Sequence, residues 1–177
     1  GKDYPSLLTC DLVCHGVPSP TVFRAYLDSL EAAHGSKVVS VRFKDKSHGW
    51  SHPWFTAEFA DGGVYTEDFN RTGYGRGFGM QLFLRPACAK CRYTSTSRPA
   101  DFTLADYWGL DEKLALPVER DKGVSMVLVN SARGQVVYDS LAGQFGQTDR
   151  PLDEAVTGNP RLKSPLKANC LLYTSPS

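Results

Sequence analysis

Short apolar runs and alternating apolar and polar positions, the patterns of buried and half-buried β-strands, recur along the chain. The strands that they predict are residues 6–13, 37–43, 54–59, 64–69, 102–105 and 125–130. The turn sequence Asp61-Gly62-Gly63 separates two of these segments and therefore predicts a β-hairpin.

Helical spacing of apolar residues is clearest between residues 20 and 34, where it gives one apolar face. Ser19 is a good N-cap and Pro20 a good first helical residue, and Gly35 predicts the end of the helix. A second helix is expected to begin after Ser131, as its cap, and to run to about residue 141.

The glycine-rich segment 71–80 has little periodicity, so we expect a loop that leads into a short helix at residues 80–84. Its glycines do not form a dinucleotide fingerprint, which needs a preceding parallel strand and a following long helix. From residue 148 the chain is proline-rich with weak helical potential. The mixed order of elements predicts an α+β (mixed α/β) fold with one central mixed sheet, flanking helices and a β-hairpin.

Length and charge narrow the classes of function. The 177 residues are enough to bury a real core. A net charge of +1 argues against a general nucleic-acid binder, which needs a basic face. We expect no membrane span, since no apolar run approaches the necessary length. Five cysteines without a secretory signal favour reduced thiols in a cytoplasmic setting, and so metal or redox chemistry over disulfides.

The cysteine pattern points to a metal or cluster site. Cys88 and Cys91 form a C-x-x-C pair, a spacing that lets two thiolates converge on one metal or cluster edge. Cys14 is the best third candidate, because it ends a strand just before a helix N-terminus, where the helix dipole favours a thiolate. Cys10 is expected to be buried as a small hydrophobe. The pair alone leaves a thiol–disulfide motif and inert thiols open as alternatives.

Five blocks in order carry a family resemblance: DLVCHGVPSP at 11–20, FKDKSHGW at 43–50, LRPACAKC at 84–91, DFTLADYWG at 101–109 and DKGVS at 121–125. They resemble the C-terminal domain of the coenzyme F420 hydrogenase/dehydrogenase beta-subunit family, and its bacterial branch most closely. On this resemblance, residues 1–169 are expected to be an N-terminally truncated copy of that domain. Residues 170–177 are expected to be a non-native tail.

The resemblance implies an electron-transfer oxidoreductase, an iron–sulfur flavoprotein with FAD and a 4Fe-4S cluster. It would exchange electrons with coenzyme F420 or with another redox partner, such as ferredoxin or a hydrogenase/dehydrogenase subunit. The resemblance places cluster ligands at Cys14, Cys88 and Cys91. A fourth family cysteine belongs to a Gly-Thr-Pro-Cys block that would lie upstream of Gly1.

Three further candidates each have a functional and a structural interpretation. His15 could tune the cluster by hydrogen bonding to sulfur or relay a proton to the flavin, which makes it the candidate catalytic residue; otherwise it is a turn histidine. Lys46 and Trp50 follow a strand and suit the phosphates or the ring of a flavin, a role that the family block favours. The structural alternative is a solvated loop with one packing tryptophan.

Arg98 suits a phosphate or the negative charge of a reduced flavin, and its alternative is an ion pair with Asp101 or Asp106. Those two acids are separated by an odd number of residues, which puts them on opposite faces of a straight strand and argues against paired carboxylate catalysis.

The remaining cofactor candidates lie in two turns. Gly109 would allow close backbone approach near the cofactor. Lys122 and Ser125 offer a cation and a hydroxyl at a strand start, a fair phosphate-contact site, or else an ordinary turn.

Two other functions stay open. One is a non-enzymatic zinc-binding domain with Cys14, His15, Cys88 and Cys91 as ligands. The other is a degenerate interaction subunit without cofactors.

Overall fold

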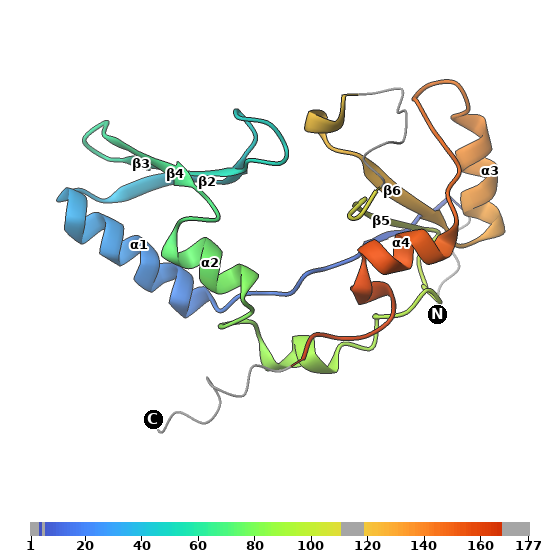
Figure 1. Ribbon diagram of the computed structural model, residues 1–177, viewed down its shortest axis with the longest axis horizontal. Helices are drawn as coiled ribbons and strands as arrows, with labels where there is room; N and C mark the ends of the chain where they lie inside the picture. Colours follow the sequence, from blue (N-terminus) through green and yellow to red (C-terminus); the bar gives the residue numbers. More distant parts are fainter. Residues whose placement is uncertain (1–3, 5, 111–118, 168–177) are drawn as a thin grey trace. The chain divides into compact units, whose positions relative to one another are not determined.

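The computed structural model describes residues 4, 6–110 and 119–167 (Figure 1). Residues 170–177, including the predicted tail and Cys170, lie outside these described residues. The chain forms two compact units. Unit 1 comprises residues 1–15 and 91–166, and unit 2 comprises residues 16–90 and 167–177. Each unit has its own sheet, and each is described by itself.

Unit 1 is built on a mixed three-stranded sheet in the order β1-β5-β6. Its strands are β1 (Cys10–Leu12), β5 (Phe102–Asp106) and β6 (Ser125–Val129). The first pair is parallel and the second antiparallel. The helices of this unit are α3 (Ala132–Ser140), α4 (Leu152–Gly158) and the 3-10 helices η2 (Arg120–Lys122) and η3 (Pro160–Leu162).

The core of unit 1 joins β6, α4 and η3. Met126, Ala155 and Leu162 are buried together, and Tyr107, Leu128 and Val156 are partly buried against them. Burial of this apolar surface is the main force that holds the two short helical elements against the sheet.

Unit 2 is built on an antiparallel sheet in the order β2-β3-β4, which α1 covers (Figure 1). Its strands are β2 (Val38–Asp45), β3 (Trp54–Phe59) and β4 (Val64–Asp68). Its helices are α1 (Pro20–His34), α2 (Gly73–Gly79) and the 3-10 helix η1 (Pro86–Lys90). The core is aromatic: Phe55 is fully buried, and the rings of Tyr26 and Tyr65 lie 5.3 Å and 6.3 Å from it, between centroids.

The α+β class is confirmed, whereas the prediction of one central sheet is wrong, because the described strands form two separate three-stranded sheets. The strand predicted at 6–13 is also too long, since only Cys10–Leu12 pairs as β1. Apolar runs show which segments are buried, but not which of them pair.

The prediction of a loop in the glycine-rich segment is wrong, because Gly73–Gly79 is helix α2. The Thr72 side chain caps this helix by accepting a hydrogen bond from the Gly75 N–H at 2.9 Å. The short helix expected at residues 80–84 is wrong as well: these residues form turns and an isolated bridge between Leu84 and Pro18.

The residues that predict the ends of helices and the hairpin turn agree better with the structure. Helix α1 begins at Pro20, as predicted, but Ser19 holds only the N-cap position, because its side chain makes no capping hydrogen bond. The helix ends at Gly35, whose φ of 85° is the left-handed conformation that glycine tolerates. Ser131 caps α3, since its hydroxyl accepts from the Gly134 N–H at 3.0 Å. Asp61 closes the β3–β4 turn by accepting from the Gly63 N–H at 2.9 Å.

Candidate functional site

Four of the five cysteines lie among the described residues, and all four are free thiols. Cys14 follows β1 and is exposed. Cys88 lies within η1 and Cys91 directly after it, and both are half-buried. Cys10 is exposed, so the prediction that it is buried is wrong: the short strand β1 leaves its side chain at the surface.

Cys88, in unit 2, accepts a backbone hydrogen bond at its sulfur. The Val17 N–H donates to Cys88 Sγ at 3.3 Å. The Arg85 N–H donates to the Val17 carbonyl at 2.8 Å, and the Cys88 N–H donates to the Arg85 carbonyl at 2.9 Å. The segment that follows Cys14 and His15 in sequence is therefore fixed against the start of the C-x-x-C motif. Amide donors of this kind stabilise a thiolate and tune the potential of a thiolate-bound cluster.

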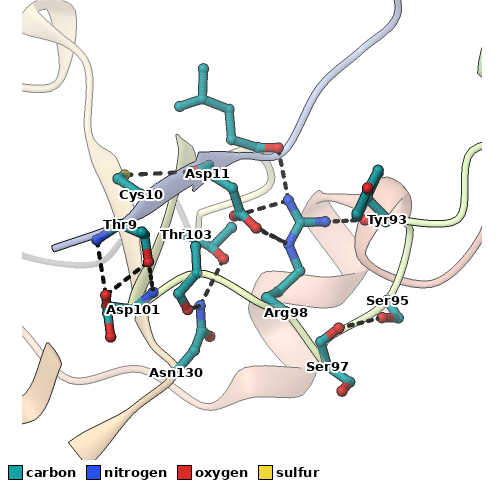
Figure 2. A network of polar contacts seen from close by, with 12 residues as sticks. Thr9, Cys10, Asp11, Tyr93, Ser95, Ser97, Arg98, Asp101, Thr103 and Asn130 are labelled. Atoms are coloured by element: carbon teal, nitrogen blue, oxygen red, sulfur yellow. Dashed lines mark hydrogen bonds and ion pairs between the residues drawn. The ribbon is translucent and has the colours of Figure 1, made fainter. Parts of the chain in front are cut away.

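Arg98, in unit 1, lies in a dense set of polar contacts (Figure 2). Its Nε and Nη2 atoms bind both carboxylate oxygens of Asp11 at 3.0–3.2 Å. Nη2 also donates to the Leu12 carbonyl at 2.8 Å, and Nη1 donates to the Tyr93 carbonyl. Only 3% of the Arg98 side chain is exposed. The ion pair considered for Arg98 thus exists, but its partner is Asp11, and the predicted partners Asp101 and Asp106 are wrong.

Asp101 organises a second set of contacts in the same unit (Figure 2). Its Oδ2 accepts from the Thr9 N–H at 2.9 Å and from the Thr9 hydroxyl at 2.8 Å, and its Oδ1 accepts from the Ser131 hydroxyl at 2.5 Å. These donors, the Ser131 hydroxyl above all, lower the pKa of Asp101 to about 2. The Asp101 carboxylate therefore connects the residue before β1, the start of β5 and the N-terminus of α3. Its role is structural.

Unit 1 also contains a cavity of about 610 Å³, within the range of small-molecule sites. Tyr107, Tyr138 and Phe145 supply an aromatic lining, and Met126 forms part of its wall. Ser125, at the start of β6, is the one predicted cofactor residue among the described lining residues.

The other three predicted cofactor residues of unit 1, which are Arg98, Gly109 and Lys122, do not belong to that lining. Gly109 has a φ of 74°, and a Cβ at this position would lie 3.3 Å from the Cα of Gly158, so its close backbone approach is to α4. Lys122 is exposed and pairs with Glu119, with 3.4 Å between Nζ and Oε2. The prediction that these two residues contact a cofactor stays a prediction.

Lys46 and Trp50 belong to unit 2, in the connection between β2 and β3. Lys46 is exposed, and its carbonyl accepts from the Gly49 N–H at 2.9 Å in a tight turn. Trp50 is half-buried. The Ser47 N–H donates to the neighbouring Asp45 at 2.9 Å and lowers the pKa of that carboxyl. Cofactor contact by Lys46 and Trp50 likewise stays a prediction.

The predicted site residues are thus divided between the units. Unit 2 holds Cys88, Lys46 and Trp50, and unit 1 holds Cys14, the exposed His15, Cys91, Arg98, Gly109, Lys122 and Ser125. Within residues 4, 6–110 and 119–167, no three histidine, cysteine, aspartate or glutamate side chains are grouped so as to hold a metal ion.

Two features went unrecognised in the sequence. One is the contact of Arg98 with Asp11, which depends on the parallel pairing of β1 with β5 across about ninety residues. Asp11 stands in the first family block, but nothing in the pattern relates it to Arg98. The other is the aromatic cavity, whose Tyr107, Tyr138 and Phe145 come from three separate segments. No local signal marks either feature.

Comparison with known proteins assigns the chain to a class of redox proteins. Residues 3–148 match the family described as the C terminus of the beta subunit of coenzyme F420 hydrogenase/dehydrogenase. The chain therefore belongs to this family, which confirms the resemblance seen in the five sequence blocks. The family's description is that of part of an oxidoreductase. No curated protein and no solved structure matches the chain. In the described part of the chain, no helix is long and apolar enough to cross a membrane.

Proposed function

We propose that this chain is an electron-transfer module that holds a 4Fe-4S cluster and FAD and exchanges electrons with coenzyme F420 or another redox partner. The observation that carries the proposal is the family match over residues 3–148. Ferredoxin or another hydrogenase/dehydrogenase subunit is the expected protein partner. The four free thiols among the described residues suit a reducing, cytoplasmic setting.

Cys14, Cys88 and Cys91 would hold the cluster, with a fourth thiolate from elsewhere in the whole protein. The Val17 N–H that donates to Cys88 Sγ supports this assignment, because a cluster-bound thiolate accepts such bonds. Cys14 precedes Val17 by three residues, and three residues of extended chain span at most about 11 Å. The covalent chain therefore limits how far Cys14 can lie from the backbone group that binds Cys88.

The chain's own side chains would bind and orient the redox groups, which supply the electron-transfer chemistry when bound. His15, adjacent to Cys14, would hold or pass the proton that accompanies flavin reduction. In unit 1, Ser125 lines a cavity with an aromatic wall, which suits a planar ring and a polar edge. Lys46, Lys122 and Trp50 would contact the phosphates and the ring of the flavin.

Serine substitution of single cysteines tests the assignment. In the full-length protein, purified without oxygen, Cys14→Ser, Cys88→Ser and Cys91→Ser should each lose the visible absorbance of the cluster, because one thiolate ligand is missing. Cys10→Ser is the matched control, since Cys10 is an exposed thiol outside the proposed ligand set. Equal absorbance in all four variants, or a colourless wild-type protein that releases no flavin on heating, contradicts the proposal.

The electron partner is tested separately with the same preparation. Reduced coenzyme F420 and reduced ferredoxin are each mixed with the oxidised protein, and bleaching of the flavin absorbance is followed over time. Rapid bleaching by one of them identifies the class of partner. Bleaching by neither donor contradicts both assignments.

A further inference from the structure

We propose that Arg98 is a positioning residue, which holds the segment that ends in Cys14 and the segment that begins at Cys91 in one arrangement. This inference rests on the proposed function, because it takes Cys14 and Cys91 as cluster ligands. It gives Arg98 a different task from cofactor contact, and all of its evidence lies within unit 1.

The contacts of Arg98 join two stretches of chain that are far apart in sequence (Figure 2). On one side the guanidinium binds the Asp11 carboxylate and the Leu12 carbonyl, the latter two residues before Cys14. On the other side it donates to the carbonyl of Tyr93, two residues after Cys91. One nearly buried side chain thus connects the backbone on the approach to Cys14 with the backbone that leaves Cys91.

The loop after Cys91 is ordered by its own short-range contacts. The Thr94 hydroxyl donates to the Cys91 carbonyl at 3.0 Å, and the Ser95 hydroxyl donates to the Ser97 carbonyl at 2.9 Å. Arg98 closes this loop through Tyr93. The position of the backbone at Cys91 therefore depends on a chain of hydrogen bonds whose connection to β1 is the guanidinium.

The chemistry of the contacts requires arginine. The Arg98 side chain must donate to three acceptor groups at once. One is the Asp11 carboxylate, which is bound at both oxygens, and the other two are the carbonyl oxygens of Leu12 and Tyr93. The planar guanidinium carries donors in a fixed fork, whereas a lysine ammonium is a single point with three donors. Arg98→Lys thus keeps the positive charge that balances Asp11, but it loses some of the hydrogen bonds that join Asp11 and Leu12 to Tyr93. Groups that orient metal ligands commonly change metal affinity by about 10- to 100-fold when they are removed.

The test measures how well the cluster is retained. Arg98→Lys and Arg98→Met are made in the full-length protein, purified without oxygen, and the rate of iron release to a strong chelator is measured. The matched controls are Arg133→Lys and Arg133→Met. Arg133 lies in the same unit and donates to the Leu7 carbonyl at 2.6 Å. Leu7 precedes β1 in sequence, whereas Cys14 follows it. We expect iron release at least about tenfold faster in both Arg98 variants and unchanged in both controls.

The reduction midpoint potential of the cluster is a second readout, because a displaced ligand changes the hydrogen bonding around the sulfurs. If Arg98→Met does not fold, as judged by circular dichroism, Arg98→Lys decides the matter. Iron release and potential equal to wild type in Arg98→Lys overturn the inference and leave the proposed function intact. Equally fast release in the Arg133 controls overturns it too. A wild-type protein without iron and sulfide overturns the proposed function itself, and this inference with it.

Discussion

Replacement of Gly75 by alanine would place a Cβ atom 1.8 Å from the carbonyl oxygen of Phe69. Real Cβ atoms essentially never approach other heavy atoms closer than 3.0 Å, so the backbone must shift on one side of the contact. That backbone also carries the cap of α2, in which Thr72 accepts from Gly75 and donates to the Phe69 carbonyl. Overpacking costs about 1–3 kcal/mol, and a weakened cap about 1 kcal/mol more. The gain in helix propensity from any glycine-to-alanine change offsets up to about 1 kcal/mol of this, so we expect Gly75→Ala to lower the free energy of unfolding by about 1–4 kcal/mol.

The same change two residues earlier should have the opposite sign. A Cβ at Gly73 would meet no heavy atom within 4 Å, and the residue lies in the first turn of α2. Gly73→Ala reduces the conformational freedom of the unfolded chain without a clash, which stabilises a helix by up to about 1 kcal/mol. The two variants differ only in which neighbours the new methyl group meets.

Urea unfolding followed by far-UV circular dichroism measures both variants against wild type. The expected midpoints fall in the order Gly73→Ala, wild type, Gly75→Ala, with Gly75→Ala clearly the lowest. If residues 73–79 were an open loop, both substitutions would have small and similar effects. Equal midpoints for the two variants would therefore refute the reasoning about α2.

Three further changes probe the two cores and the polar contacts. Phe55→Ala removes a fully buried ring and should cost unit 2 about 3–5 kcal/mol in urea unfolding, and a loss below about 1 kcal/mol would contradict its central place. Gly158→Ala would put a Cβ 1.6 Å from the Trp108 carbonyl oxygen, so the melting temperature should fall and the fluorescence of Trp108 should change; an unchanged melting curve opposes this contact. The low pKa of Asp101 means that its ionised form stabilises the fold above pH 3.8, and that this contribution is lost as the pH falls towards about 2. The difference in melting temperature between wild type and Asp101→Asn should therefore shrink over this range, and a constant difference would count against the assignment.

Local signals in the sequence predict most of the elements correctly. The boundaries of α1 follow from Pro20 and Gly35, because a proline at the first helical position and a glycine terminus act through nearest neighbours. The strand Trp54–Phe59 and the turn after it follow from the hairpin signal Asp61-Gly62-Gly63. The segment 73–79 escapes such prediction because glycine is a poor helix former, and a side-chain cap together with tight packing outweighs that local preference.

The site is less accessible to prediction. The cysteine candidates follow from spacing and from the family blocks, and the family itself is confirmed. The partner of Arg98 could not be predicted, because Asp11 lies 87 residues away and is brought close only by the pairing of β1 with β5. The aromatic cavity likewise depends on how separate segments pack. Long-range pairing of this kind leaves no periodic trace in a single sequence.

The iron, acid-labile sulfide and zinc contents of the full-length protein, purified without oxygen, test the central proposal most directly. A 4Fe-4S cluster predicts about four iron and four sulfide per chain for that centre, together with bound flavin and no stoichiometric zinc. One zinc per chain without sulfide would show instead that the cysteines serve a structural metal, and it would contradict the assignment of this chain to electron transfer.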